Sequence, residues 1–436
     1  GDLPPSGVAY DPYTRLQVEG QVLGLVVAGQ STNQANPGET VEVILPDTCF
    51  YIESGGQVSD TGKITALDGS WEIQVQDLRK PAAGAIVHIG TVVHGNPKLG
   101  DTAVAAVDAG RRQDIMRNHT ATHLLHAELH RVLGEHARQA GSLVAPDRLR
   151  FDFNHPEAVR PEQLAEIEAG VNRHILGNFD LNITYKPLQQ AMKEGAMALF
   201  GEKYGETVRT ITIGGNQPFS YELCGGTHVD ETGDIGLCLI TSEGSVAAGI
   251  RRIEAVTGRG AYALVQRRFQ ILHQAANLLG SSIDLLPEKA EAVLEEISTY
   301  RKLVGSLRQN LVAAEFNQVL ANPESVNQVT VVTATLTEAD ADTLRLMVDR
   351  FRQRFPTNSV AVLASVLAGR PTLIAAVSDD LIKRGLNANE LVKFVAAPLG
   401  GSGGGKPTLA QAGGKDATKL PQALAAVAGW IKEKLK

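Results

Sequence analysis

The sequence is poor in cysteine and lacks any long hydrophobic run. Its 436 residues include three cysteines, Cys49, Cys224 and Cys238, which disfavours a secreted disulfide scaffold and favours a reducing cytosol. No apolar stretch approaches the ~20 residues that a membrane helix needs. The first residues, Gly1 to Pro5, contain no basic segment followed by an apolar one, which argues against a signal peptide. They also lack an initiator methionine, so we expect a processed chain or an excised fragment of a longer protein. From the low cysteine count we expect a cytoplasmic location.

Length and charge indicate several domains of unequal character. A chain of 436 residues is too long for one core and suggests about three domains of roughly 100–200 residues. The net charge is −7, made up of −8 for residues 1–110, −4 for residues 111–258 and +5 for residues 259–436. Because Lys and Arg displace counterions from phosphates, the C-terminal third is the expected contact surface if a polyanion binds. The alternative is an ordinary solvated surface.

The N-terminal quarter has the pattern of a β domain. Short β-like runs alternate with turn clusters over residues 15–107, which predicts a small β-barrel or sandwich. The clearest predicted strands are residues 21–27, 40–45 and 85–89. We assign a β-barrel domain to residues 1–110.

The pattern changes to a helical one at Arg111. Apolar residues recur at helical spacing as far as Leu133, and Gly134 is a plausible stop. A second helix is predicted over residues 161–176, opened by Pro161. Predicted strands follow at residues 208–213, 235–243 and 250–256. We assign an α+β domain to residues 111–258.

The remaining residues read as a helical linker and a further domain. Residues 287–318 contain few helix breakers, and their apolar side chains step alternately by four and three. This heptad spacing predicts a coiled coil or an antiparallel helical hairpin within a linker at 259–325. The alternative is a long helix packed on its own domain. The seam residues are Val293, Ile297, Tyr300, Val304, Leu307, Leu311, Ala314 and Gln318. Alternating strands and helices then predict an α/β domain over residues 326–436.

Two short motifs carry the metal-binding chemistry. His119-Thr120-Ala121-Thr122-His123 and Cys224-Gly225-Gly226-Thr227-His228 each hold two ligand-type residues four positions apart. That spacing puts both side chains on one face of a helix, and Gly225-Gly226 allows a sharp turn in the second motif. Three imidazoles and one thiolate form a suitable tetrahedral set for Zn²⁺. Partly buried structural histidines are the alternative for the first pair taken alone.

The sequence leaves the role of the metal open. Four protein ligands usually close a structural zinc site, whereas catalytic zinc keeps one position for water or substrate. A zincin mechanism is disfavoured, because Thr120 to Thr122 provide no carboxylate between the two histidines.

Two further features could contact phosphate. Gly400-x-x-x-x-Gly405-Lys406 fits a phosphate loop, but Pro407 stands where Ser or Thr would bind Mg²⁺. We instead expect a flexible loop at Gly403, Gly404, Gly405 and Lys406, whose amides and ammonium group meet an RNA backbone, or a plain flexible loop. The other feature is Arg251-Arg252. Strand alternation predicts one core-side arginine in an internal ion pair and one that is free for phosphate.

The motifs together resemble the editing region of the alanyl-tRNA synthetase family. His119–His123 and Cys224–His228 match its editing domain, and residues 50–57 (FYIESGGQ) resemble the preceding barrel. Residues 139–144, 149–153 and 249–258 resemble the interior and end of that domain. The helical stretch resembles the family's linker, and the glycine-rich end resembles its C-terminal domain. Threonyl-tRNA synthetases share the metal pairs, but the Cys-Gly-Gly-Thr-His form favours the alanyl type.

The resemblance implies hydrolysis of Ser-tRNA(Ala) and Gly-tRNA(Ala) by residues 111–258. It further implies a Zn²⁺ ion held by His119, His123, Cys224 and His228, with Gln139 helping to recognise the misattached amino acid and Thr120 or Thr122 supplying a hydroxyl nearby. The C-terminal domain would bind the body of tRNA(Ala), and the helical and C-terminal parts could form a homodimer. No upstream aminoacylation domain is visible. The alternatives are a free-standing trans-editing deacylase, a tRNA-binding module in which zinc only stabilises the fold, and a homodimeric scaffold.

Overall fold

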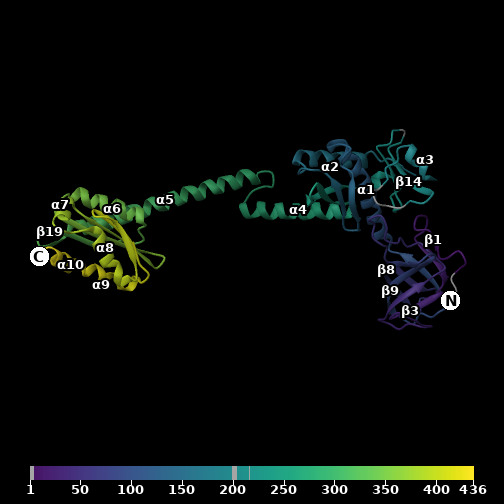
Figure 1. Cartoon of the computed structure of the whole chain (residues 1–436), viewed down its shortest axis with the longest axis horizontal. Coiled ribbons are helices and arrows are strands. Elements are labelled where there is room, and N and C mark those ends of the chain that lie inside the picture. The colour runs from purple at the N-terminus through teal and green to yellow at the C-terminus, as the bar shows by residue number, and fades with distance from the viewer. Residues whose placement is uncertain (1–3, 199–203, 216) are drawn as a thin grey trace. The chain divides into compact units, whose positions relative to one another are not determined.

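The computed structural model describes residues 4–198, 204–215 and 217–436 (Figure 1). The chain forms two compact units, Gly1–Gln274 and Ala275–Lys436. The predicted mixture of helices and strands in several domains is confirmed. The domain boundaries at 110, 258 and 325 stay predictions.

The first unit begins with a curled, half-barrel sheet of eight strands in the order β2-β10-β7-β8-β9-β5-β3-β4. The pairing is antiparallel throughout, and its concave side encloses a core that includes Val41, Ile64 and Ile73. Among the described strands, the end strands β2 and β4 are not paired with each other, so the sheet is an open half-barrel. The strands are β2 (Gln17–Gln21), β3 (Gly24–Val27), β4 (Gln30–Ser31), β5 (Thr40–Ile44), β7 (Gly62–Ala66), β8 (Glu72–Ala82), β9 (Ala85–His94) and β10 (Thr102–Val107). A separate parallel pair joins β1 (Ala9–Tyr10) to β6 (Asp47–Thr48).

The predicted strand at 21–27 is wrong as one continuous element. It is interrupted at Val22 and Leu23, because Val22 N–H donates to Asp101 O and Leu23 N–H donates to Ile44 O. The chain therefore changes partners between β2 and β3 within one sheet.

The second part of this unit is built around helix α1 (Ala109–Leu133), which Asp108 caps by accepting a hydrogen bond from Arg111 N. Leu124, Leu125 and Leu129 of α1 are fully or nearly fully buried against the neighbouring sheet and helix. A four-stranded sheet runs in the order β11-β12-β17-β16, and a three-stranded sheet in the order β13-β14-β15. These strands are β11 (Gln139–Val144), β12 (Leu149–Asn154), β13 (Leu181–Pro187), β14 (Thr207–Ile213), β15 (Ser220–Leu223), β16 (Cys238–Ala247) and β17 (Ile250–Thr257). The other helices are α2 (Pro161–Leu176), α3 (Leu188–Lys193), the 3₁₀ turn η1 (Thr232–Ile235) and α4 (Gly258–Leu279).

Contacts between the half-barrel and the second part of the unit bring a loop of the half-barrel to β11. Val144 N–H donates to Gly56 O at 2.7 Å, and Val58 N–H donates to Val144 O at 3.1 Å. Gly56 has φ of +83°, and a Cβ there would lie 2.4 Å from Ser142 Oγ. A side chain at Gly56 would therefore prevent this close approach, which delivers Gln57 to the interior.

The second unit holds a six-stranded mixed sheet in the order β18-β19-β20-β21-β23-β22. Within this sheet β19 and β20 pair in parallel, and the other described pairs are antiparallel. The strands are β18 (Glu324–Val326), β19 (Val329–Thr335), β20 (Ser359–Leu367), β21 (Arg370–Val377), β22 (Ser402–Lys406) and β23 (Leu409–Gly413). The helices are α5 (Leu286–Ala321), α6 (Ala341–Arg354), α7 (Asp379–Lys383), α8 (Ala388–Ala396), η2 (Ala397–Leu399), η3 (Ala417–Lys419), α9 (Leu420–Ala425) and α10 (Val427–Lys434).

Helix α5 leaves most of its predicted heptad seam exposed. Leu307 is 58% and Leu311 is 64% exposed, whereas Val312, Ala313 and Phe316 near its C-terminus are buried in the core of the unit. The helix covers the predicted residues 287–318. Its C-terminal end packs in the core of its own domain. Coiled-coil pairing of the seam stays a prediction.

The expectation of a flexible loop at Gly403–Lys406 is wrong. These residues form β22, an edge strand paired antiparallel with β23 from Ser402↔Gly413 to Lys406↔Leu409. Glycine permits this pairing, because a Cβ on Gly403 would lie 2.3 Å from Gln411 O.

Across the residues that the structure describes, no helix combines the length and the hydrophobicity required to span a bilayer.

Candidate metal centre

The structure brings the two predicted motifs together. His119 and His123 lie on α1, and their rings are nearly parallel with centroids 5.5 Å apart. Cys224 and His228 lie in the segment that follows β15. One ligand atom from each of the four side chains lies within 4.8 Å of the others. The chain therefore contains a group that could hold a metal ion.

The second motif reaches this geometry through a turn instead of a helix. Cys224 Sγ lies 3.3 Å from both His228 Nε2 and His119 Nε2. A Cβ on Gly226 would lie 1.9 Å from His119 Cε1. Glycine is therefore required at this position, because the backbone of the turn passes directly over the imidazole of His119.

Gln57 of the half-barrel sets the tautomer of His119. Thr227 N–H donates to Gln57 Oε1 at 2.9 Å, so this side-chain atom is an oxygen. The same oxygen lies 2.7 Å from His119 Nδ1, which must then carry a proton and donate it. The lone pair of His119 is consequently on Nε2, which faces Cys224 Sγ. Such partners on the remote ring nitrogen are typical of metal-binding histidines.

The other two histidines also have partners at Nδ1. His123 Nδ1 lies 2.8 Å from Glu222 Oε2, a close contact and not a well-aligned hydrogen bond. His228 Nδ1 lies 3.1 Å from Thr120 Oγ1. All three imidazoles are therefore contacted at Nδ1. The Nε2 atoms of His119 and His228 face the thiol sulfur.

Charge in the cluster also suits a bound cation. Burial would raise the pKa of the Cys224 thiol, but the imidazoles of His119, His228 and His123 lower it well below its usual value. Burial lowers the pKa of His228 to about 3, which leaves a neutral ring. Burial also opposes charge on His123, yet Glu222 and Cys224 raise its pKa to about 10. Without a metal, the protonated His123 supplies the positive charge that the thiolate and Glu222 need, and a bound metal ion would take over this role.

Of the two candidate threonines, Thr120 faces the metal ligands. Thr120 Oγ1 contacts His228 and accepts a hydrogen bond from Val229 N at 3.3 Å. Thr122 donates instead to Asn118 O on its own helix at 2.8 Å. Its hydroxyl is therefore engaged with the helix backbone.

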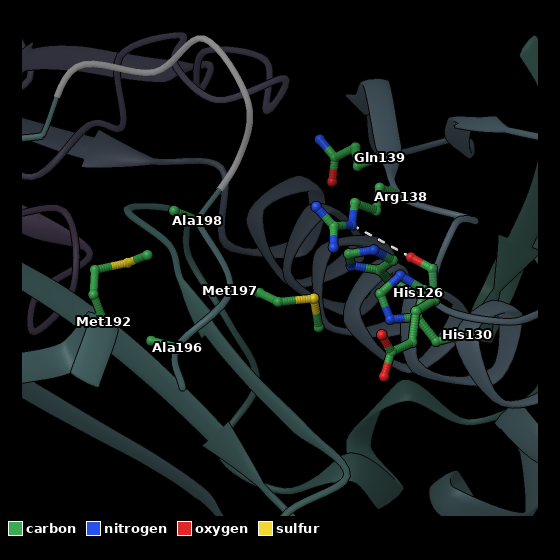
Figure 2. A pocket seen from close by; sticks show the side chains of 9 residues that line it. His126, His130, Arg138, Gln139, Met192, Ala196, Met197 and Ala198 are labelled. Atoms are coloured by element: carbon green, nitrogen blue, oxygen red, sulfur yellow. Dashed lines mark hydrogen bonds between the residues drawn. The ribbon is translucent and has the colours of Figure 1, made fainter. Parts of the chain in front are cut away.

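Gln139 lies in a pocket near the cluster. Its Nε2 donates to Ser142 Oγ at 3.1 Å, and no described contact joins it to the four ligand residues. The pocket has a volume of about 490 Å³. Figure 2 shows Gln139 and Arg138 with His126 and His130 on one side and Met192 and Met197 on the other.

Arg251 and Arg252 both form ion pairs, so the expectation of one free arginine is wrong. Arg251 binds both oxygens of Glu243 at 2.6 and 2.8 Å, and Arg252 binds Asp152 at the same two distances. The carboxylates lie on the strands at either side of β17. These bidentate pairs would have to open before either arginine could bind phosphate through its fork.

Sequence reasoning missed several residues around the cluster. Gln57 is separated by 62 positions from His119 and gives no local signal. Glu222 precedes Cys224 by two positions. His126 and His130 repeat the four-residue spacing of His119 and His123 along α1, and this repetition could have been noticed.

Three family models match the chain. The model described as "tRNA synthetases class II (A)" matches residues 8–111, "Threonyl and Alanyl tRNA synthetase second additional domain" matches residues 208–254, and "DHHA1 domain" matches residues 328–433.

Curated proteins match nearly the whole chain. The alanine–tRNA ligase of Chloroflexus aurantiacus is 44% identical over 434 residues, which cover 98% of this chain and 48% of that protein. That of Geobacillus kaustophilus is 44% identical over 420 residues, covering 96% and 47%. The chain thus spans about half the length of these relatives. The crystal structure of the C-Ala domain from Aquifex aeolicus alanyl-tRNA synthetase is 32% identical, covers 26% of this chain and 97% of that chain, and has a TM-score of 0.23.

Proposed function

Because this chain is related to the C-terminal portion of alanyl-tRNA synthetases, we propose that it hydrolyses the ester of Ser-tRNA(Ala) and Gly-tRNA(Ala). Discrimination by one small group in a binding pocket reaches only roughly 10–200-fold. An alanine pocket therefore rejects glycine and serine poorly, and a second hydrolytic site corrects the errors. The observation that carries the proposal is the convergence of His119, His123, Cys224 and His228.

The four converging side chains would hold Zn²⁺ through three imidazole nitrogens and one thiolate sulfur. When bound, the ion would orient the aminoacyl ester, and it would polarise the ester as a Lewis acid by expanding its coordination beyond the four protein ligands. Gln57, Glu222 and Thr120 keep the imidazoles in the binding orientation through their Nδ1 contacts. Burial of these groups excludes bulk water from the ligands, because His119, His123 and His228 are each no more than 6% exposed.

Other parts of the chain would recognise the substrate. Gln139 is proposed to contact the misattached amino acid from its pocket. Lys406 and those amides of Gly403, Gly404 and Gly405 that face the open edge of β22 are proposed to meet the backbone of tRNA(Ala), since successive amides of the strand alternate between β23 and the open edge. Arg251 and Arg252 would join them only if phosphate displaced their carboxylate partners. A homodimer through α5 and the C-terminal domain is proposed from the exposed seam.

Release of serine tests the proposal. Zinc-loaded protein should free serine from Ser-tRNA(Ala) and leave Ala-tRNA(Ala) intact. Cys224→Ala should abolish release with the fold retained. Cys238→Ala is the matched control, because Cys238 is buried in the core of the same part of the chain and lies outside the ligand group. A folded, zinc-loaded protein that releases no serine would contradict the proposal and favour a tRNA-binding module stabilised by its metal.

A further inference from the structure

The turn between Cys224 and His228 has no regular secondary structure to hold its backbone. Residues 224–229 lie outside any helix or strand. Two of them, Gly225 and Gly226, are glycines, which lose more conformational freedom on folding than any other residue. The distance between the two ligands on this turn is therefore set by the groups that contact its backbone.

The side chains of two distant residues hold three successive carbonyl groups of this turn. Arg209 Nη1 donates to Cys224 O at 3.0 Å and to Gly226 O at 2.7 Å. The Tyr13 hydroxyl donates to Gly225 O, which lies between them in sequence, at 2.7 Å. A carbonyl only accepts hydrogen bonds, so the direction of all three contacts is fixed. The three peptide groups that follow one another in the turn are consequently each held at the oxygen.

The amide ends of the same peptide groups contact the surroundings of the metal ligands. Gly226 N–H donates to Cys224 Sγ at 3.4 Å. Thr227 N–H donates to Gln57 Oε1 at 2.9 Å. The carbonyl held by Tyr13 and the amide that faces the sulfur belong to one peptide group. A displacement of that carbonyl would therefore also move the amide beside the thiol.

Arg209 is held in place by β14 and by the ring of Tyr13. Its backbone carbonyl accepts from Cys224 N–H at 3.1 Å. Its guanidinium carbon lies 4.3 Å from the centre of the Tyr13 ring. A guanidinium group over an aromatic ring is a favourable contact. Each of the two residues therefore keeps the other in position to donate to the turn.

Tyr13 reaches the turn from the half-barrel, on a segment that is anchored to α1. Asp11 Oδ1 accepts from Tyr13 N–H at 3.0 Å, and Arg112 Nη1 of α1 donates to Pro12 O at 2.6 Å. Arg112 is 3% exposed and forms an ion pair with Asp60 of the half-barrel. The same helix carries two of the four metal ligands. The segment of Tyr13 and these ligands therefore share one support.

We propose that Tyr13 and Arg209 are positioning residues of the metal centre, which fix the turn so that Cys224 and His228 converge on the ion. They act through backbone carbonyls and make no contact with the ion themselves. The inference rests on the proposed function for the metal centre, and it is independent of the hydrolysis of the ester.

The zinc affinity of the full chain tests the inference without any tRNA. Competition with a chromogenic chelator should show about tenfold weaker binding in Tyr13→Phe, which keeps the ring and loses one hydrogen bond. Arg209→Ala loses two hydrogen bonds and should weaken binding about 10–100-fold. Arg209→Lys keeps a cationic donor and should recover part of this loss.

Two matched variants control for the loss of a hydroxyl and of a guanidinium group. Tyr185 is 64% exposed and lies opposite Arg209 on β13, so Tyr185→Phe removes a hydroxyl without touching the turn. Arg173 is exposed on α2, so Arg173→Ala removes a cation elsewhere in the same part of the chain. Both variants should bind zinc as tightly as the wild type does.

Cobalt(II) in place of zinc separates positioning from general stability. Its visible absorption depends on the geometry of its ligands, and a charge-transfer band from the cysteine sulfur reports on Cys224 directly. The spectra of Tyr13→Phe and Arg209→Lys should differ from that of the wild type, whereas the spectra of both controls should match it. If Arg209→Ala does not fold, Tyr13→Phe decides the question.

The inference and the proposed function can fail separately. Wild-type zinc affinity in both Tyr13→Phe and Arg209→Ala would overturn the inference, as would wild-type cobalt spectra in both Tyr13→Phe and Arg209→Lys. A wild-type chain that binds neither metal would also overturn it. Weaker zinc binding and altered cobalt spectra in these variants, together with a wild-type chain that releases no serine, would support the inference and contradict the proposed hydrolysis.

Discussion

Single residues outside the ligand set control the geometry of the metal centre. Each histidine of the cluster is held at Nδ1 by a different side chain, and these side chains come from the half-barrel, from β15 and from α1 itself. Gln57 is fully buried, and its amide accepts from His119 and Thr227 while donating to Thr227 Oγ1 at 2.9 Å. The half-barrel therefore contributes directly to the preorganisation of the site.

Replacement of Gln57 tests this positioning role. Gln57→Ala leaves His119 Nδ1 and Thr227 N–H without their acceptor, and zinc affinity should fall about 10–100-fold. Gln57→Glu keeps the accepting oxygen, so its zinc affinity should be closer to that of the wild type. Competition with a chromogenic chelator measures the affinity. Gln139→Ala is the control and should bind zinc as tightly as the wild type does. Equal zinc affinity in Gln57→Ala and in this control would show that Gln57 does not position the metal ligands.

His88 should make the half-barrel sensitive to acid. Burial lowers the pKa of His88 to about 4 from the usual value near 6.5, although a hydrogen bond to Val43 opposes the shift. Between these two pKa values the unfolded chain binds more protons than the folded chain. The contribution of neutral His88 to the free energy of unfolding is therefore fully present above pH 6.5, and it falls by up to about 3 kcal/mol as the pH drops toward 4.

Urea unfolding at pH 7.5 and pH 5 measures this loss, followed by Trp71 fluorescence in a Trp430→Phe background. His88→Gln should lose much of the pH dependence between these values. His94→Gln, at an exposed position of the same strand, should keep it. If the pH dependence of unfolding is unchanged in His88→Gln, it arises from other titratable groups.

At the level of elements, the edge strand β22 shows how small residues permit close pairing. A Cβ on Gly403 would lie 2.4 Å from Ala412 Cβ, whereas the nearest atom to a Cβ on Gly404 is Asn389 Oδ1 at 3.5 Å. Two adjacent glycines thus face different surroundings within one strand, so their alanine variants form a matched pair.

Gly403→Ala should destabilise the C-terminal unit by about 1–3 kcal/mol, because the added methyl group forces β22 away from β23. Gly404→Ala should change stability by less than about 0.5 kcal/mol. Thermal unfolding followed by Trp430 fluorescence gives both values. If both variants are neutral, these residues are not held in a strand.

At the scale of the whole molecule, the apolar seam of α5 is a surface that a single chain leaves exposed to solvent. Leu307 and Leu311 are more than half exposed, as are Leu294 and Tyr300 on the same helix. Burial of each such side chain is worth roughly 1.5–3 kcal/mol. A second copy of the helix could cover the seam by heptad packing.

Sedimentation equilibrium should therefore show a dimer at micromolar concentrations. The double variant Leu307→Lys with Leu311→Lys should be monomeric, because two charges would be placed in the apolar seam. Thr299→Lys with Gln309→Lys adds the same charge at exposed positions off the seam and should stay dimeric. A wild-type monomer, or a dimer in both variants, would exclude the seam as the interface.

Much of the architecture follows from local patterns in the sequence. Helical periodicity placed α2 at residues 161–176 and a helix through His119 and His123, because one face of each helix packs on a core. The four-residue spacing of both motifs predicted the four residues that now converge. These signals are local, since ligand chemistry and periodicity are both properties of short segments.

Only the tertiary structure decided which distant residues meet. Gln57 reaches His119 because the half-barrel loop docks on β11, and both arginines of β17 find carboxylates on neighbouring strands. The glycine run forms a strand because β23 is available to pair with it. In each case the partner lies elsewhere in the chain, and its free-energy contribution exists only after the fold has brought the two segments together. Local sequence therefore predicts the ligands, and long-range packing determines how they are oriented.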